Sequence, residues 1–153
     1  MLTVLLVGIV VAALDLVSKL AVMATMVEGQ SIPVIQGVLT LHFIRNPGAA
    51  YGFLLGKRWV LATLAALVSG GLVWYARQTK LPQERIGLGL ILGGAIGNLH
   101  NRVAWGAVTD LIEIDPLSNV FLVFNLADVA ITAGILLLLW TAFRQHKERP
   151  ELT

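Results

Sequence analysis

The sequence predicts an all-α membrane protein with four transmembrane helices, a small extracytoplasmic β-element and both termini in the cytoplasm. Three observations predict it. Of the 153 residues, 57% are hydrophobic and only 13% are charged, with a mean hydropathy of +0.82, which is unusual for a soluble domain. Four apolar stretches approach the ~20 residues that span a bilayer. Lys and Arg are distributed unevenly between the connecting segments, and the length suits a single integral domain, residues 1–153.

The apolar stretches predict helices at about residues 2–27, 59–76, 86–104 and 124–143. Asp15 and Lys19 interrupt the first stretch, and no basic segment precedes it. We therefore interpret it as a retained helix and not as a secretory signal peptide. In the third stretch, Gly93-Gly-Ala-Ile-Gly97 is typical of close helix packing in lipid.

The basic residues orient the chain. Six of its eleven Lys and Arg residues lie in the 77–85 connector and the C-terminal tail: Arg77, Lys80, Arg85, Arg144, Lys147 and Arg149. The positive-inside rule places these segments in the cytoplasm and predicts outer loops at 28–58 and 105–123. Within the first outer loop, residues 38–44 roughly alternate between apolar and polar types, which predicts a short strand or ribbon.

Polar residues inside or beside the apolar stretches form a second pattern. In chain order they are Asp15, Lys19, Asn98, Arg102, Asp110, Asn125 and Asp128. Several stand three or four residues apart, so they share a helix face. The predicted topology brings all of them near the outer surface. A charged group at a helix centre costs roughly 2.5–3.5 kcal/mol on insertion scales, so each is a functional-site candidate.

Asp110 and Asp128 indicate general acid–base chemistry on water. Like charge keeps two adjacent carboxylates from ionising together, so one acts as base while the other acts as acid. The chain has no Cys, and no Ser or Thr has an evident base partner. His42, His100 and His146 are scattered, so we expect no metal site. We also expect no cofactor and no nucleic-acid partner, since no basic patch is interleaved with aromatic residues.

Each polar pair also has a structural interpretation. Asp15 and Lys19 would form an ion pair that tethers helices. Asn98 and Arg102 would cap a helix or reach the membrane interface. The two aspartates would be carboxylates that favour helix N-termini. These alternatives stay open from the residues alone.

Two other functions also stay open. A small transporter would use Asp15, Asp110 and Asp128 as a proton relay through the membrane. A catalytically silent assembly protein would tolerate loss of either aspartate. Glu113 and Asp115, which also follow the third helix, are expected in a solvated outer loop.

The chain resembles lipoprotein signal peptidase (signal peptidase II), a family of bacterial inner-membrane aspartic proteases. Five motifs carry the resemblance, in the family's order: Asp15-Leu-Val-Ser-Lys19, Arg45-Asn-Pro-Gly-Ala-Ala-Tyr-Gly-Phe53, Gly94-Ala-Ile-Gly-Asn98 with Arg102, Gly106-Ala-Val-Thr-Asp110, and Phe124-Asn-Leu-Ala-Asp128. Each motif is weak alone, but five in order are specific.

The resemblance implies that Asp110 and Asp128 are a catalytic dyad. It implies substrate-binding or dyad-supporting roles for Asp15, Lys19, Asn46, Gly48, Asn98, Arg102, Asn125 and Ala127. The implied substrate is a diacylglyceryl-modified prolipoprotein, cleaved just before its lipidated Cys. The implied protein is a metal-free, multi-pass monomer of the bacterial plasma (inner) membrane. Its active site would lie at the extracytoplasmic face in contact with membrane lipid, be blocked by globomycin-type cyclic peptides, and have a β-cradle formed by the 28–58 loop.

Four positions depart from the family's common pattern. Asn101 stands where an Asp often precedes the Arg, and His100 is unusual beside it. Leu111 replaces a frequent Phe, and Val129 replaces a frequent Ser. Both aspartates are retained, so these departures do not argue against activity, but they leave the hydrogen bonding around Arg102 undefined.

Overall fold

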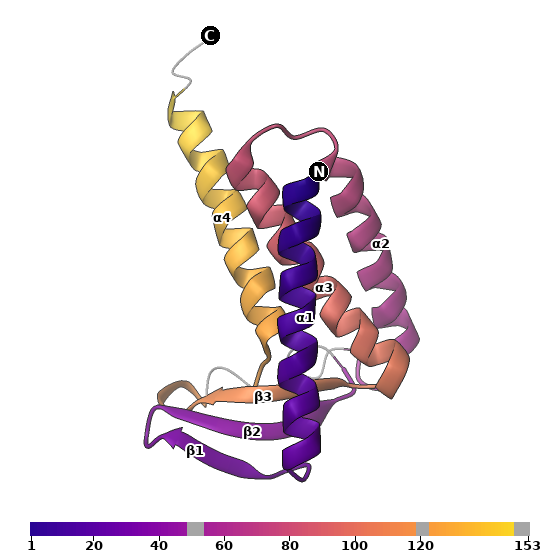
Figure 1. The fold of residues 1–153 in the computed structure, drawn as a ribbon, viewed down its shortest axis with the longest axis vertical. Coiled ribbons are helices and arrows are strands. Elements are labelled where there is room, and N and C mark those ends of the chain that lie inside the picture. Colours follow the sequence, from indigo (N-terminus) through magenta and orange to yellow (C-terminus); the bar gives the residue numbers. More distant parts are fainter. Residues whose placement is uncertain (49–53, 119–122, 149–153) are drawn as a thin grey trace.

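The computed structural model describes residues 1–48, 54–118 and 123–148, which form a mostly helical protein with a small sheet at one end (Figure 1). The elements in chain order are α1 (Leu2–Thr25), β1 (Ser31–Ile35), β2 (Leu39–Asn46), α2 (Arg58–Ala76), α3 (Pro82–Trp105), β3 (Val108–Ile114), the 3-10 turn η2 (Asp115–Leu117) and α4 (Leu126–Glu148). The helices differ from the sequence prediction at their ends. α3 begins at Pro82 instead of 86, and α4 runs to Glu148 instead of 143. Proline suits a first helical turn, and charged residues continue a helix beyond its apolar part.

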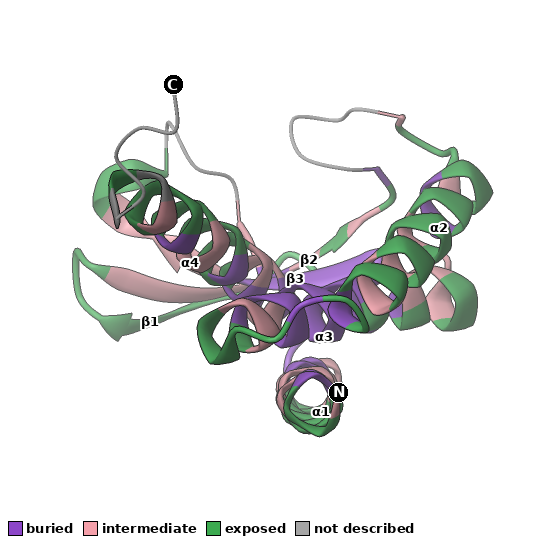
Figure 2. Ribbon diagram, turned by 90° about the horizontal axis from the view of Figure 1, so that it is seen from above, coloured by how far each residue is buried: buried purple, intermediate pink, exposed green. Residues whose placement is uncertain are grey.

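Helix α3 is the centre of the bundle. It packs against α1, α2 and α4, and seen from above its buried surface lies among three helices whose outer faces are exposed (Figure 2). Among the described residues, α1, α2 and the 126–145 part of α4 are long and apolar enough to cross a membrane. α3 is not in that set, because glycine and polar residues that contact other helices take the place of lipid-facing apolar side chains.

Glycines allow the helix backbones to approach closely, as the sequence predicted. A Cβ at Gly93 would lie 2.6 Å from the Gly8 carbonyl oxygen, where α3 crosses α1. A Cβ at Gly134 would lie 2.6 Å from the Gly87 carbonyl oxygen, where α4 crosses α3. Such contacts are the main source of helix association in lipid, where apolar burial gives no driving force between helices.

We expect Gly93→Ala to destabilise the bundle by ~1–3 kcal/mol, the usual cost of overpacking, because the backbones of α1 and α3 must separate. Gly71→Ala on α2 is the matched control, since a Cβ there meets nothing within 4 Å. Thermal unfolding of both variants in the same detergent measures the difference. Equal stability of the two variants would show that the α1–α3 crossing can relax without cost.

The sheet combines strands from both predicted outer loops. Its order is β1-β2-β3, with antiparallel pairing throughout. β1 and β2 come from the 28–58 loop, where the sequence predicted a strand at 38–44. β3 comes from the 105–123 loop and was not predicted. It pairs with β2 in a register that sets Asn46 opposite Val108 and Ile44 opposite Asp110.

One acidic residue of the second loop is therefore placed differently from the prediction. Glu113 was expected in a solvated loop, but it lies in β3, half-buried, with its carboxylate 2.8 Å from Nδ1 of His42 on β2. Asp115 begins the η2 turn that follows the strand. The local sequence could not indicate this, because the partner of Glu113 is 71 residues away.

The two ends of the bundle differ in chemistry. The sheet lies at one end, and the start of α1 and the end of α4 lie at the other (Figure 1). Exposed basic residues follow α2 and end α4 at the end away from the sheet: Arg77, Lys80, Arg144 and Lys147. Residues 49–53 of the Arg45–Phe53 motif and Arg149 lie outside the described residues.

Candidate functional site

Asp110 is held by two amide side chains at the sheet end of the bundle. It is the third residue of β3 and only 2% exposed. Its Oδ1 accepts a hydrogen bond from Nδ2 of Asn125 at 2.6 Å, and its Oδ2 accepts one from Nδ2 of Asn46 at 3.1 Å. Asn46 ends β2, so the β2–β3 register brings it beside the carboxylate.

Asp128 is oriented by the first turn of α4. Asn125 precedes the helix, and its Oδ1 accepts the Asp128 backbone N–H at 3.1 Å. In return, Oδ2 of Asp128 accepts the Asn125 backbone N–H at 3.2 Å. This reciprocal pair is a capping box, which follows from the i, i+3 spacing of the two residues. Asp128 is thus also a helix N-terminal carboxylate, as in the structural interpretation, and the Asn125 side chain links Asp128 to Asp110.

A buried ion pair supports Asp128 from α1. Nζ of Lys19 lies 2.7 Å from Oδ2 of Asp15 and donates to Oδ1 of Asn98 at 2.9 Å. Nδ2 of Asn98 then donates to Oδ1 of Asp128 at 2.9 Å. The other oxygen of Asp15 accepts the Ala127 backbone N–H at 3.0 Å. Asp15 and Lys19 are both 0% exposed. They form the predicted ion pair that tethers helices, and their hydrogen bonds to Asn98 and Ala127 connect this pair to Asp128.

Arg102 closes the arrangement into a ring. Its Nη2 donates to the Gly48 carbonyl at 3.0 Å, and its Nη1 donates to the Asn98 carbonyl at 3.3 Å. The Gly48 backbone N–H donates to Oδ1 of Asn46 at 3.0 Å. All ten residues named from the sequence therefore belong to one connected hydrogen-bond network. In the described part of the chain, every buried side-chain nitrogen and oxygen has a partner, so the network carries no orphaned polar group.

The environment of Asp110 favours its protonated form. Burial, and next the negative charge of Asp128, raise the pKa of Asp110 to about 6. Hydrogen bonds from Asn46 and Asn125 and the charge of Lys19 oppose this increase. Two neighbouring carboxyl groups, one of them with a raised pKa, suit acid–base chemistry on water.

This pKa predicts a pH-dependent stability. Below pH 3.8 the carboxyl of Asp110 is protonated in both folded and unfolded states. Between 3.8 and about 6 the folded state keeps a proton that the unfolded state releases, so stability falls as pH rises through this window. We expect Asp110→Asn, which is always neutral, to gain up to roughly 3 kcal/mol over the wild type from pH 4 to 7. Unfolding in detergent at each pH measures this, and parallel curves for the two proteins would contradict it.

A family model described as signal peptidase (SPase) II matches residues 7–144. The chain belongs to the signal peptidase II family. It is 38% identical to the lipoprotein signal peptidase of Symbiobacterium thermophilum over 133 residues, which covers 86% of this chain and 88% of that protein. It is 44% identical to the lipoprotein signal peptidase of Geobacillus thermodenitrificans over 131 residues, covering 84% and 81%.

Solved structures share the fold of this chain. A bacterial membrane enzyme determined by the in meso method at 2.3 Å resolution matches with a TM-score of 0.92 and 28% identity, covering 100% of this chain and 94% of that one. A second such enzyme, at 1.9 Å, matches with a TM-score of 0.85 and 30% identity, covering 93% of each chain. The family is one of peptidases, and its likeness to this chain extends over the helices and the sheet.

Sequence analysis missed one residue near Asp110. Asn101 was considered only as a departure from the family pattern, but it is 0% exposed and joins α3 to β3. Its Oδ1 accepts the backbone N–H of Thr109, the neighbour of Asp110. An amide at membrane depth in an apolar helix was the signal that could have found it, because such a group requires partners.

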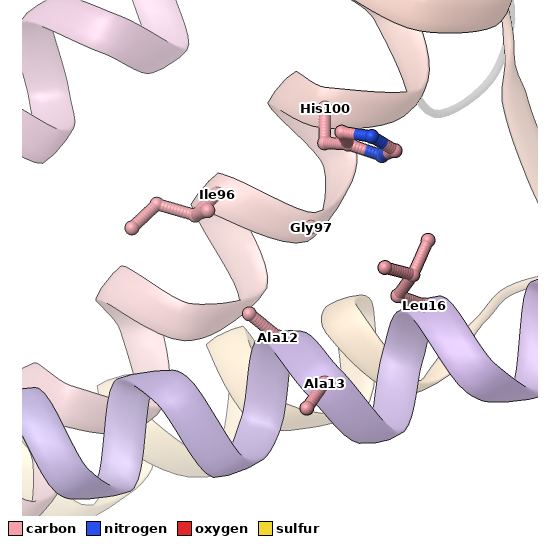
Figure 3. Close-up of a pocket in the computed structure, with 6 residues that line it drawn as sticks. All are labelled: Ala12, Ala13, Leu16, Ile96, Gly97 and His100. Carbon is pink, nitrogen blue, oxygen red and sulfur yellow. The ribbon is translucent and has the colours of Figure 1, made fainter.

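A hollow of about 210 Å³ lies between α1 and α3, apart from the two aspartates (Figure 3). Its lining consists of Ala12, Ala13, Leu16, Ile96, Gly97 and His100. Of these lining residues, Gly97 lies close to Asp15, since a Cβ at Gly97 would meet Oδ2 of Asp15. Across residues 1–48, 54–118 and 123–148, no group of three or more His, Asp or Glu side chains is arranged to hold a metal ion.

Proposed function

We propose that this chain is an aspartic endopeptidase that removes the signal peptide from diacylglyceryl-modified prolipoproteins, cleaving just before the lipidated Cys. Asp110 and Asp128 carry the reaction. One observation supports this most directly: both carboxylates are bound by Asn125, one through the amide side chain and the other through the capping box. In a member of the signal peptidase II family, this juxtaposition favours a shared acid–base role.

The pair acts by exchanging one proton. The ionised carboxylate takes a proton from water, whose oxygen bonds to the scissile carbonyl carbon. The protonated carboxyl gives its proton to the carbonyl oxygen, and a tetrahedral gem-diol forms. The C–N bond then breaks, the amine takes the proton that came from water, and the diol returns a proton to the second carboxylate. The raised pKa of Asp110 brings the protonation of its carboxyl closer to neutral pH, and two coupled carboxyl groups titrate as a unit.

The supporting residues hold the dyad and the peptide. Asn98 fixes one oxygen of Asp128, and Lys19 fixes the orientation of Asn98. Asn46 fixes Asp110 from the sheet. Arg102 holds the backbone at Gly48, whose N–H donates to Asn46. The peptide substrate would lie along the sheet.

We further propose that all four helices cross the membrane as a single domain, with both termini in the cytoplasm. The exposed basic residues lie at the end away from the sheet, which favours that side as cytoplasmic. α3 can cross despite its polar residues because the other three helices shield it. The dyad then lies at the extracytoplasmic face of the bacterial plasma membrane, where the lipid-modified Cys of a precursor is anchored.

The gathering of polar groups at one end disfavours a proton relay. Lys19, Asn98, Asp110 and Asn125 are all buried in the sheet half of the bundle or the sheet itself, whereas a transporter would distribute such groups through the membrane depth. The proposed partners are the prolipoprotein, membrane lipid and globomycin-type cyclic peptides, with the enzyme acting as a monomer and requiring no cofactor.

The test is cleavage by purified protein in lipid nanodiscs of a precursor with and without diacylglyceryl on its Cys. We expect cleavage of the modified precursor only, with a product whose first residue is the lipidated Cys, as identified by mass spectrometry. A globomycin-type peptide should block it. Equal cleavage of both precursors, or a cut elsewhere in the sequence, would contradict the proposed substrate.

A further inference from the structure

The turn between α3 and β3 is closed by one buried side chain. Nδ2 of Asn101 donates to the Gly97 carbonyl at 3.2 Å, and its Oδ1 accepts the Thr109 backbone N–H at 3.0 Å. Thr109 is also fully buried and directly precedes Asp110. We propose that Asn101 is a positioning residue for the reaction: by fixing the backbone at Thr109, it fixes where the Asp110 carboxylate lies. This inference rests on the proposed function.

The two partners of Asn101 define the chemistry that its position requires. A carbonyl oxygen only accepts and a backbone N–H only donates, so the side chain between them must supply one donor and one acceptor. An amide does so without charge. An ionised carboxylate would still accept from Thr109, but it would face the Gly97 carbonyl oxygen without a proton between them. The Gly97 backbone cannot move easily away from that carboxylate, because it is packed so closely against Asp15 that a Cβ at Gly97 would meet Oδ2 of Asp15.

The neutrality of Asn101 also matters for the charges around the dyad. Asp110 faces the negative charge of Asp128 from α4 and the positive charges of Lys19 from α1 and Arg102 from α3. The side chains that reach it from β2 and from the start of α4 are neutral amides, Asn46 and Asn125. A carboxylate at position 101 would add a negative charge beside Thr109 and favour the protonated form of Asp110.

The experiment compares Asn101→Ala, which loses both bonds, with Asn101→Asp, which keeps the bond from Thr109. Leu88→Ala is the matched control, because Leu88 is 1% exposed on the same helix, in the core cluster with Val4. Cleavage of the diacylglyceryl precursor is measured against pH for each variant. The carboxyl of Asp110 is titrated without substrate by infrared difference against Asp110→Asn.

We expect Asn101→Ala to lower kcat by roughly ten- to a hundredfold with little change in KM, since small displacements of reacting groups have effects of this size. Asn101→Asp should recover much of that loss at its own optimum. The alkaline limb of its cleavage rate against pH and the pH at which the Asp110 carboxyl titrates should both move to higher pH. Leu88→Ala should lose stability while keeping the kcat and the pH profile of the wild type.

Two results would overturn the role of Asn101. One is a kcat per folded molecule that is the same in Asn101→Ala and Leu88→Ala. The other is an Asp110 titration that does not move in Asn101→Asp, which decides the matter if Asn101→Ala does not fold. A wild type that fails to cleave the precursor contradicts the proposed function instead, and the substrate-free titration still tests Asn101.

Discussion

Replacing either Asp110 or Asp128 by asparagine is expected to slow cleavage of the diacylglyceryl precursor about a hundredfold or more, the range of general acid–base catalysis. The amide keeps the size of the side chain and can keep one accepted hydrogen bond, but it can neither take a proton from water nor give one to the carbonyl. Because the two groups act as a unit, the double variant should be no worse than the poorer single variant.

The measurement is the initial rate at a saturating precursor concentration, with enzyme in nanodiscs. Glu113→Gln is the matched control: it changes an acid to an amide on the same strand, but its partner is His42, outside the dyad. It should keep its rate within about threefold, because the Glu113–His42 pair makes no hydrogen bond to either aspartate. Processing that survives in both aspartate variants would rule out the aspartic mechanism. Loss in Glu113→Gln as well would instead indicate damage to the sheet.

Local spacing made much of the site predictable. A helix brings residues four apart onto one face, so Asp15 and Lys19 could be paired from the sequence. The spacing of Asn125 and Asp128 likewise corresponds to a capping box in the structure. The prediction that polar residues meet at one end needed only the direction of each helix. The contacts that depend on short-range spacing could therefore be predicted from the sequence.

Long-range pairing was not predictable in the same way. β3 follows α3, after which Gly106, at φ +80°, turns the chain, and its partner β2 lies over 60 residues away. No periodicity within 108–114 identifies that partner. Asn101 was missed for a related reason, since its acceptor role is toward a strand that had not been predicted. The central place of α3 follows from glycine contacts to two helices, which depend on the packing of the whole bundle.

Lys19→Met is expected to produce the largest combined loss, in both stability and cleavage. Methionine fills a similar volume but removes the ammonium, leaving the Asp15 carboxylate buried at 0% exposure with the Ala127 backbone N–H as its donor from α4. Removing one member of a buried ion pair costs about 3–5 kcal/mol, because the other charge loses its compensation. Asn98 also loses the donor that fixes its amide, so Asp128 is no longer held in one orientation.

The double variant Asp15→Asn with Lys19→Met separates these two effects. Without the buried carboxylate, no uncompensated charge remains, and the asparagine oxygen can still accept from Ala127, so we expect unfolding measurements to show much of the lost stability recovered. Cleavage should stay low, because Asn98 still lacks its donor and is free to turn its amide away from Asp128. Recovery of both cleavage and stability would show that Lys19 has a purely structural role. Recovery of stability alone would show that the buried ammonium acts through Asn98 on the dyad.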